Sequence, residues 1–538
     1  MLHITGALTC TDLTFRLPDG HTVLDGVTFS LGPGRHGIVG DNGAGKSTLL
    51  KIITGELAPT GGHVRFSGEL ASLPQDPAID PRRRVAALLG VETTQSALRR
   101  IEAGSVEVRD FDLVGEDWDI DQRLTAALSR IGLDAIDLDR PVGSLSGGEL
   151  MLLSLTAQLL RRPDVLLLDE PTNSLDSATR SRVHDLILDF PGTLVVVSHD
   201  RDLLERVDSI AEVRDGGVHW YGGGLSLFEA AVAAEQEAAA QAVATAQSDV
   251  RRQQRDLTAQ HTKQARRDRQ GRKKADSLPP IVAHAYRRRA EESAGRLKAL
   301  HEGRLGEARE TLQSAERRVR DDAEIRIDLP DTAVPASRDV LRARSLRPAY
   351  GSAVLDLMLR GPERVALTGP NGVGKTSLLR CLSEQEDPVD GEGELLVPHR
   401  LLPQDLQVLD PGLSVLENVH RHAPEADLTR IRHQLAHFLL RGDAVHQSAG
   451  SLSGGERWRA TLASLLLAEP APQLLILDEP TNNLDFASVR HLVQALRSYQ
   501  GALLVVSHDE HFLEQLDLDR RILVAGRNID DGRMTADA

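Results

Sequence analysis

The sequence contains little cysteine and no long apolar run. Only Cys10 and Cys381 occur among 538 residues, and their separation excludes a cysteine-based metal site. Two thiols in so long a chain are typical of a reducing compartment, which predicts a cytoplasmic location. The longest apolar runs are far shorter than a bilayer span, and the N-terminus MLHITGALTC lacks both a basic flank and a long apolar segment. We therefore expect neither a membrane span nor a signal peptide.

The chain as a whole also lacks positive charge, but one segment does not. The formal net charge is −16. Residues 251–300 hold 15 Lys and Arg against 5 Asp and Glu, a local +10 that leaves −26 for the rest. An acidic body with one basic segment predicts contact with a polyanion at one place. The length and the 41% hydrophobic content suit two to four domains with sizeable cores.

One stretch, residues 144–176, occurs twice. It contains SLSGGE, then a helix-like apolar run, then VLLLDEPTNSLD; the second copy has SLSGGE from Ser451 and LLILDEPTNNLD ending at Asp485. An apolar run ending in two carboxylates predicts a parallel strand buried on both faces. Open α/β sheets bind ligands at the carboxyl ends of such strands. A core strand with a charged end would explain one copy, but not the full repeat.

The carboxylates at the two strand ends suit metal and water chemistry. Asp169 can hold Mg²⁺, which prefers oxygen ligands, and Glu170 is then placed to polarise an attacking water. Asp478 and Glu479 occupy the same positions in the second copy.

A glycine-rich loop precedes each carboxylate strand. Residues 40–47 and 369–376 match G-x4-G-K-[S/T], whose backbone N–H groups surround phosphates. The lysine reaches the terminal phosphates and the hydroxyl faces Mg²⁺. The predicted nucleotide-binding residues of the two loops are Gly40, Asp41, Asn42, Gly43, Ala44, Gly45, Lys46, Ser47 and Thr48, then Gly369, Pro370, Asn371, Gly372, Val373, Gly374, Lys375, Thr376 and Ser377. The predicted Mg²⁺ ligands are Ser47, Asp169, Thr376 and Asp478.

Single polar residues recur at matching places in the two copies. Gln75 and Gln404 each follow Leu-Pro and can coordinate Mg²⁺ or the attacking water, while His199 and His508 each follow VVS and can contact the γ-phosphate. A lone glutamine or histidine is usually a local feature, whereas repetition favours a role in both sites. Phe15, on an early alternating segment, either stacks on adenine or packs in the core.

The composition changes between residues 227 and 274, where alanine, glutamine, glutamate and arginine dominate without proline. This favours a long helix. A seven-residue apolar repeat flanks the break at Leu278-Pro279-Pro280, formed by Val243, Val250 and Leu257 before it and by Leu305, Leu312 and Val319 after it. The pattern predicts an antiparallel coiled-coil hairpin whose first arm spans about 70 Å. A solvated spacer is the alternative. Six basic residues crowd the predicted tip: Arg272, Lys273, Lys274, Arg287, Arg288 and Arg289.

The offset between the copies is not constant. It is 309 residues from Asp169 to Asp478 but 329 from Lys46 to Lys375. The first copy therefore has 20 extra residues between loop and carboxylates, which we place in the acidic stretch 103–120. The predicted domains are 1–225 and 331–538, with the basic helical hairpin linker at 226–330.

These motifs resemble those of a known family. GDNGAGKST and GPNGVGKTS resemble Walker A motifs, and the two LSGGE strings resemble ATP-binding cassette signatures. LLLDEPTNSLD and LILDEPTNNLD resemble Walker B followed by the D-loop, with His199 and His508 as switch histidines. Over essentially its whole length the chain resembles the ABC-F class. The resemblance implies an α/β fold of two P-loop ATP-binding cassettes joined by an antiparallel helical, coiled-coil linker.

The resemblance also implies an activity and partners. Members hydrolyse ATP with Mg²⁺ and act on the ribosome; some tune translation, and others displace ribosome-targeting antibiotics. Two ATP molecules would be sandwiched between the cassettes, each loop facing the other cassette's signature. The implied signature residues are Ser146, Gly147, Gly148, Glu149, Ser453, Gly454, Gly455 and Glu456, and the implied catalytic residues are Glu170, Glu479, His199, His508, Gln75 and Gln404. The closed form would occupy the tRNA exit site. The linker hairpin would point toward the peptidyl-transferase centre, and its basic residues would contact ribosomal RNA and the P-site tRNA. Because the cassettes are paired in one chain, no obligate oligomer is implied.

Some features depart from the family pattern. The 20-residue excess is small for the arm that some members insert in the first cassette, and the 30 residues after His508 are too few for the C-terminal coiled-coil domain of some relatives. The adenine-stacking residue of the second cassette is Tyr350 or Arg347. Two competing functions are the ATPase half of a membrane exporter and a DNA-associated repair ATPase. Sedimentation with ribosomes, membranes or DNA in the presence of ATP separates the three.

Overall fold

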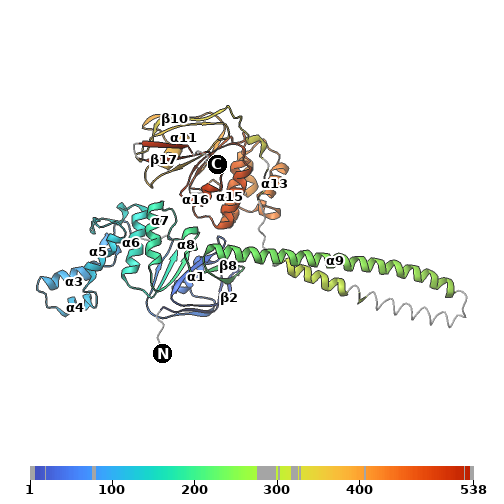
Figure 1. Cartoon of the computed structure of the whole chain (residues 1–538), viewed down its shortest axis with the longest axis horizontal. Helices are drawn as coiled ribbons and strands as arrows, with labels where there is room; N and C mark the ends of the chain where they lie inside the picture. Colours follow the sequence, from blue (N-terminus) through green and yellow to red (C-terminus); the bar gives the residue numbers. More distant parts are fainter. Residues whose placement is uncertain are drawn as a thin grey trace. The chain divides into compact units, whose positions relative to one another are not determined.

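The structure is a computed structural model (Figure 1) that describes residues 6–18, 20–75, 80–275, 299–300, 303–316, 325, 327, 329–404, 408–525 and 528–533. The chain forms two compact units. One comprises Met1–Leu225 together with Ala323–Ala538, and the other comprises Ser226–Asp322. The first unit contains both copies of the repeated motifs, called here the first and second repeats.

A six-stranded sheet forms the centre of the first repeat. Its order is β5-β6-β7-β3-β8-β9, and all neighbours are parallel except β8 and β9. The strands are β3 (Gly34–Val39), β5 (Leu70–Leu73), β6 (Val165–Asp169), β7 (Thr193–Val197), β8 (Ser209–Arg214) and β9 (Gly217–Gly222). Both β6 and β7 are buried along their whole length, as their apolar sequences predict for strands covered on both faces.

A smaller antiparallel sheet and several helices complete this repeat. The sheet has the order β2-β1-β4, with β1 (Leu8–Arg16), β2 (Thr22–Leu31) and β4 (Gly61–Phe66). The helices outside the extra segment are α1 (Lys46–Ile53), α2 (Val85–Leu88), α5 (Ile120–Arg130), α6 (Gly147–Leu160), α7 (Ser177–Leu188) and α8 (Arg201–Glu205). Side chains of β1, β2, α1 and the central strands share one hydrophobic core, which fixes α1 against the sheet.

The second repeat has the same topology. Its large sheet has the order β14-β15-β16-β12-β17-β18, and its small sheet β11-β10-β13. The strands are β10 (Asp339–Arg347), β11 (Leu355–Arg360), β12 (Arg364–Thr368), β13 (Asp390–Leu395), β14 (His399–Leu402), β15 (Leu474–Asp478), β16 (Ala502–Val506), β17 (Arg520–Ala525) and β18 (Asn528–Arg533). The helices are α11 (Lys375–Leu382), α12 (Val415–His422), α13 (Leu428–His437), α14 (Gly454–Leu466), α15 (Phe486–Ser498) and α16 (Glu510–Glu514). Short 3₁₀ helices occur at η1 (Val142–Ser144), η2 (Pro330–Thr332), η3 (Gly442–His446) and η4 (Ala449–Ser451). The predicted α/β class with two such modules is confirmed.

The extra residues of the first repeat form two additional helices. Between α2 and α5 the chain builds α3 (Glu92–Glu102) and α4 (Val108–Val114), whereas α12 is followed directly by α13 in the second repeat. The acidic stretch chosen from the sequence, 103–120, contains α4 but not α3, so the extra segment begins earlier than we expected. The acidic composition of the sequence identified only the second part of the extra segment, which contains α4.

The other unit is helical in its described part. Helix α9 (Leu225–Ala275) has 51 residues, about 77 Å at 1.5 Å per residue, and residues 303–316 are also helical. The heptad residues Val250 and Leu305 are buried, although most of α9 is exposed. Buried positions on a mostly exposed helix indicate packing along one stripe, as the heptads predict. Val319 and the predicted break at Pro279-Pro280 lie outside the described residues.

None of the helices in the described part of the chain combines the length and apolarity that a bilayer crossing requires.

Candidate functional site

Two glycine-rich loops are built alike at the starts of α1 and α11. Gly40 has φ 148° and a Cβ there would lie 2.4 Å from Val213 O; Gly369 has φ 149° and would meet Val524 O at the same distance. Only glycine fits this close approach of loop to strand. The loops then curl so that Lys46 Nζ donates to Gly40 O, at 2.6 Å, as Lys375 Nζ does to Gly369 O at 2.7 Å. Each lysine is thereby held against its own loop, beside the helix N-terminus.

The paired carboxylates lie at the ends of β6 and β15. Asp169 and Asp478 are the last strand residues, and Glu170 and Glu479 follow with φ of 51° and 47°, in the left-handed region. A non-glycine residue in that region stores strain, and it occurs at the same position in both repeats. Burial raises the pKa of Glu479 to about 7, opposed by the His508 N–H and then by Lys375, and it raises the pKa of Glu170 further, opposed by Lys46. Both carboxyls are therefore poised to exchange protons near neutral pH.

The aspartates and adjacent hydroxyls suit a divalent cation. The Ser47 hydroxyl acts on Asp169, and the Thr376 hydroxyl on Asp478, to lower the pKa of the neighbouring carboxyl in part. Oδ1 of each aspartate is buried and accepts no hydrogen bond from any described residue. Burial raises the pKa of both aspartates, so a cation would relieve an uncompensated charge. A hard, all-oxygen donor set fits Mg²⁺, which takes its other ligands from water and phosphate.

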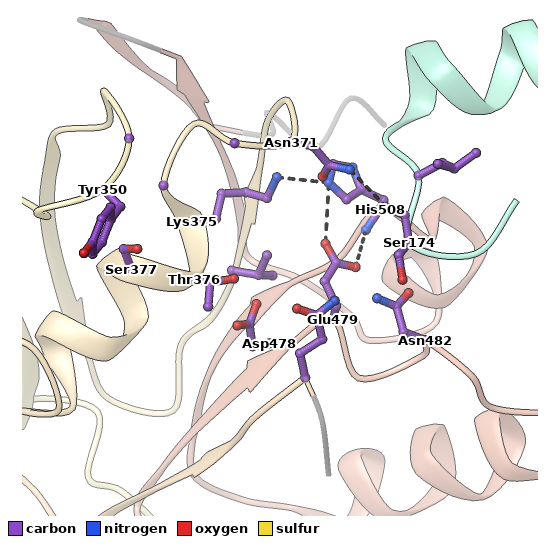
Figure 2. Close-up of a pocket in the computed structure, with 16 residues that line it drawn as sticks. Ser174, Tyr350, Asn371, Lys375, Thr376, Ser377, Asp478, Glu479, Asn482 and His508 are labelled. Atoms are coloured by element: carbon purple, nitrogen blue, oxygen red, sulfur yellow. Dashed lines mark hydrogen bonds and ion pairs between the residues drawn. The ribbon is translucent and has the colours of Figure 1, made fainter. Parts of the chain in front are cut away.

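Site 2, the site on the loop of the second repeat, opens into a cavity of about 340 Å³ (Figure 2). Within it, Lys375 Nζ lies 3.0 Å from His508 Nε2, and Glu479 Oε2 accepts from His508 N at 3.2 Å. Burial and the positive charge of Lys375 lower the pKa of His508 to about 4. The imidazole is therefore neutral at pH 7 and can accept from the lysine in one tautomer.

Site 1, the site on the loop of the first repeat, has the equivalent histidine and glutamate. His199 Nε2 lies 3.4 Å from Glu170 Oε1, and neither ring nitrogen of His199 has a hydrogen-bond partner among the described residues. Burial, followed by Lys46, strongly lowers the pKa of His199. The ring of Phe486, from the second repeat, stands edge-on to this imidazole with centroids 5.3 Å apart and planes at 81°. Site 1 therefore includes an aromatic side chain from the other repeat.

Hydrogen bonds cross between the repeats at both sites. Asn42 N donates to Asp485 Oδ2 at 2.6 Å, and Asn42 Nδ2 donates to Asn483 O at 2.8 Å. In the reciprocal direction, Asn371 N donates to Asp176 Oδ2 at 3.3 Å. Each phosphate loop is thus tied to the residues that follow the carboxylate strand of the other repeat. Both sites are composite.

The two signature segments begin helices α6 and α14. Ser146 and Ser453 are N-caps, and each forms a capping box with the glutamate three residues later, Glu149 or Glu456. A Cβ on Gly454 would lie 3.3 Å from Asn42 Cβ, so this signature lies beside the loop of the first repeat. The remaining predicted signature residues are Gly147, Gly148 and Gly455 in the first turns of these helices. The serines and glutamates have a structural role in addition to the one predicted for them.

Other predicted residues have varied positions. Gln404 lines the cavity of site 2, and Gln75 Nε2 lies 3.5 Å from Asn483 Oδ1 at the interface of the repeats. Tyr350 lines the cavity at the end away from Glu479 (Figure 2), whereas Arg347 does not line it. Phe15 is half-buried against the core of its repeat. Among the predicted tip residues, Arg272, Lys273 and Lys274 belong to α9 without described side chains, and Arg287, Arg288 and Arg289 lie outside the described residues.

Sequence reasoning missed the residues that join the repeats. Asn173, Asn483 and Phe486 were not predicted as site residues, yet Asn173 Nδ2 donates to Asn483 Oδ1 at 2.8 Å across the interface. The repeated strings TNSLD and TNNLD were the available signal, since both follow the carboxylates directly.

Comparison with known proteins agrees with this geometry. A family model described as "ABC transporter" matches residues 24–173 and 353–482. The chain is 33% identical to the tylosin resistance ATP-binding protein TlrC of Streptomyces fradiae, over 91% of this chain and 92% of that protein. It is 31% identical to the energy-dependent translational throttle protein EttA of Escherichia coli K12 (93% and 89%), and 30% identical to ABC transporter F family member 5 of Arabidopsis thaliana (92% and 72%). A solved structure of RNase-L Inhibitor aligns with a TM-score of 0.55 over 95% of this chain and 87% of that one, at 19% identity, which reflects a common fold.

Proposed function

Because the chain belongs to the ATP-binding cassette family, and within it to the ABC-F class, and is an ATPase, we propose that it is a ribosome-associated factor. In its ATP-closed form it binds the ribosome at the tRNA exit site. There it modulates translation or protects the ribosome from antibiotics. Residues 1–225 and 331–538 are the two cassettes, and 226–330 is the linker that reaches the RNA.

The observation that carries this proposal is full-length similarity to two relatives with related printed functions. One is named for tylosin resistance and the other for energy-dependent translational throttling. Both alignments run through the linker as well as the cassettes, since each covers more than nine tenths of this chain. A basic segment between acidic cassettes supports a polyanionic partner.

The chemistry that we assign to the two sites follows their geometry. Glu170 and Glu479 polarise the attacking water, and His199 and His508 position the γ-phosphate. Bound Mg²⁺, held by the hydroxyl and aspartate of each site, would neutralise charge on the phosphates. Lys46 and Lys375 are each hydrogen-bonded to a carbonyl of their own loop. A rotation of each side chain toward a terminal phosphate would let its ammonium group bind that phosphate.

Neutralising basic residues of the linker tests the proposal that the protein binds the ribosome. Replacing Arg272, Lys273 and Lys274 by Gln removes three charges near the predicted tip of α9. Each lost phosphate contact should reduce the slope of log affinity against log salt by about 0.7 to 0.9. The measurement is co-sedimentation with ribosomes in ATP over a salt series, with Glu170→Gln and Glu479→Gln holding the closed form.

The matched control removes three charges from the same helix closer to the cassettes. Arg251, Arg252 and Arg255 are exposed on α9, and replacing them by Gln should leave the salt slope unchanged. Basal ATPase should be normal in both triple variants. Equal binding curves for the tip variant and the parent would overturn the RNA role of the tip, and sedimentation with membranes or DNA in place of ribosomes would favour the exporter or repair alternative.

A further inference from the structure

Phe486 contacts two side chains of the other cassette. It is the first residue of α15, and its ring is edge-on to His199 at 5.3 Å. The Arg201 guanidinium lies over the same ring, with Cζ 5.6 Å from the centroid. Both partners lie just after β7 of the first cassette. One side chain of the second cassette therefore contacts the segment that carries the switch histidine of the first.

The placement of Phe486 depends on the docking of the two cassettes. The preceding Asp485 is 3% exposed, caps α15 through Ser488 N, and accepts from Asn42 N across the interface. Asn483, two residues earlier, accepts from the Asn42 side chain. These hydrogen bonds fix the backbone before and after Asp485, and therefore the start of α15. The ring of Phe486 therefore meets His199 across the same interface that these hydrogen bonds span.

The equivalent position in the first cassette is occupied by Ser177. It follows Asp176 and begins α7 as Phe486 follows Asp485 and begins α15, but it has no ring to offer His508. That histidine has a polar partner instead, Lys375 Nζ at 3.0 Å. His199 has no such hydrogen bond among the described residues. The His199 ring is therefore positioned by an aromatic contact, and the His508 ring by a hydrogen bond to a lysine.

We propose that Phe486, supplied by the second cassette, is a positioning residue for His199, so that an aromatic side chain at this position speeds hydrolysis at site 1 but not at site 2. This rests on the assignment of Glu170 and His199 to site 1. The ring packs against the imidazole and fixes its orientation, while the Arg201 guanidinium lies over the ring and fixes the ring in turn. The contact links docking of the cassettes to alignment of one histidine.

Substitutions at 486 in single-site backgrounds test the proposal. Glu479→Gln leaves site 1 and Glu170→Gln leaves site 2. Phe486→Ser, which reproduces Ser177, should lower kcat at site 1 roughly threefold to tenfold with KM for ATP nearly unchanged, the scale of one aromatic pair. At site 2 the same change should alter kcat less than twofold. Phe486→Tyr should restore site 1, and Phe66→Ser, which removes an exposed ring elsewhere, should change neither.

A second measurement does not depend on turnover. In protein labelled with ¹³C-histidine, loss of the Phe486 ring should move the His199 resonance and leave that of His508 in place. Equal losses of kcat in both backgrounds, a rise in KM alone, or an unmoved His199 resonance would overturn the proposal. Failure of the site assignment itself would be visible separately, because Glu170→Gln or Glu479→Gln alone would then leave full activity.

Discussion

The two ATP sites have the same motifs but are closed differently. The bond from the loop asparagine N–H to the opposing aspartate is 2.6 Å at site 1 and 3.3 Å at site 2. The bond from its side chain to the opposing carbonyl is 2.8 Å at site 1 and 3.1 Å at site 2. At site 1 the histidine has an aromatic contact, whereas at site 2 the histidine has a hydrogen bond to the lysine. Identical motifs therefore do not make equivalent sites, since each site is completed by the opposite cassette.

The largest effect is expected from removing both catalytic carboxylates. Glu170→Gln combined with Glu479→Gln should keep ATP binding and lower turnover by about 100-fold or more, the scale of a general base. Each single variant should leave the rate of one site, and a difference between these two rates measures the asymmetry. Steady-state phosphate release gives all three values. Near-normal hydrolysis by the double variant would contradict the assignment of the bases.

Removing the lysine of each phosphate loop should affect the two sites unequally. Lys46→Ala and Lys375→Ala each delete charge-assisted hydrogen bonds aimed at phosphate, a loss of roughly tenfold to 100-fold in ATP affinity. Lys375→Ala also removes the partner of His508, so it should lower turnover at its site more than Lys46→Ala does at the other. Titration calorimetry with ATP and single-site turnover measure the two effects. Equal losses at both sites would show that the lysine–histidine bond is incidental.

The crossing aspartates offer a smaller and more local test. Asp485→Asn and Asp176→Asn retain an oxygen to cap their helices but lose the charge on the bond to the opposing loop. The difference between a charged and a neutral acceptor is about 1 kcal/mol, or roughly fivefold. Because the bond to Asp485 is the shorter, Asp485→Asn should weaken ATP-driven closure more than Asp176→Asn. Fluorescence energy transfer between labels on the two cassettes reports closure; the opposite ranking would count against the difference seen in bond length.

The smallest effect is a displacement along the pH axis. A general base works when deprotonated, so a raised pKa moves the rise in activity to higher pH. In the Glu170→Gln background, kcat/KM should rise with pH through about 7, the pKa of Glu479. In the Glu479→Gln background the rise should come higher, because burial raises the pKa of Glu170 further, to about 8. Superimposable profiles would mean that the two carboxyls are equally solvated in the working enzyme.

The sequence predicted the parts of the fold that local physics determines. Gly40 and Lys46 follow from the geometry that a phosphate loop requires, and the apolar run ending at Asp169 predicted β6. Phe486 and Ser177 also differ visibly in the sequence. That difference has no consequence until docking brings Phe486 to His199, 287 positions away in the chain.

The same limit applies to the adenine position and to the extra helices. Tyr350 lies three residues beyond Arg347, and only the conformation of the chain after β10 places one of them in the cavity. Helix α3 ends with two arginines and a glutamate and is not part of the acidic run. Acidic composition alone therefore could not identify it as part of the extra segment.

The reciprocal bonds between phosphate loops and opposing D-loops have a thermodynamic consequence. Asn42 lies in the loop of site 1 but is bonded to residues that follow Glu479 of site 2. A nucleotide that orders this loop therefore stabilises the segment beside the other nucleotide. Linkage requires the effect to be mutual: if ATP at site 1 raises the affinity of site 2 by some factor, ATP at site 2 raises that of site 1 by the same factor. The two sites can therefore have different rates of ATP hydrolysis, but a single coupling free energy describes the effect of each bound ATP on the affinity of the other site.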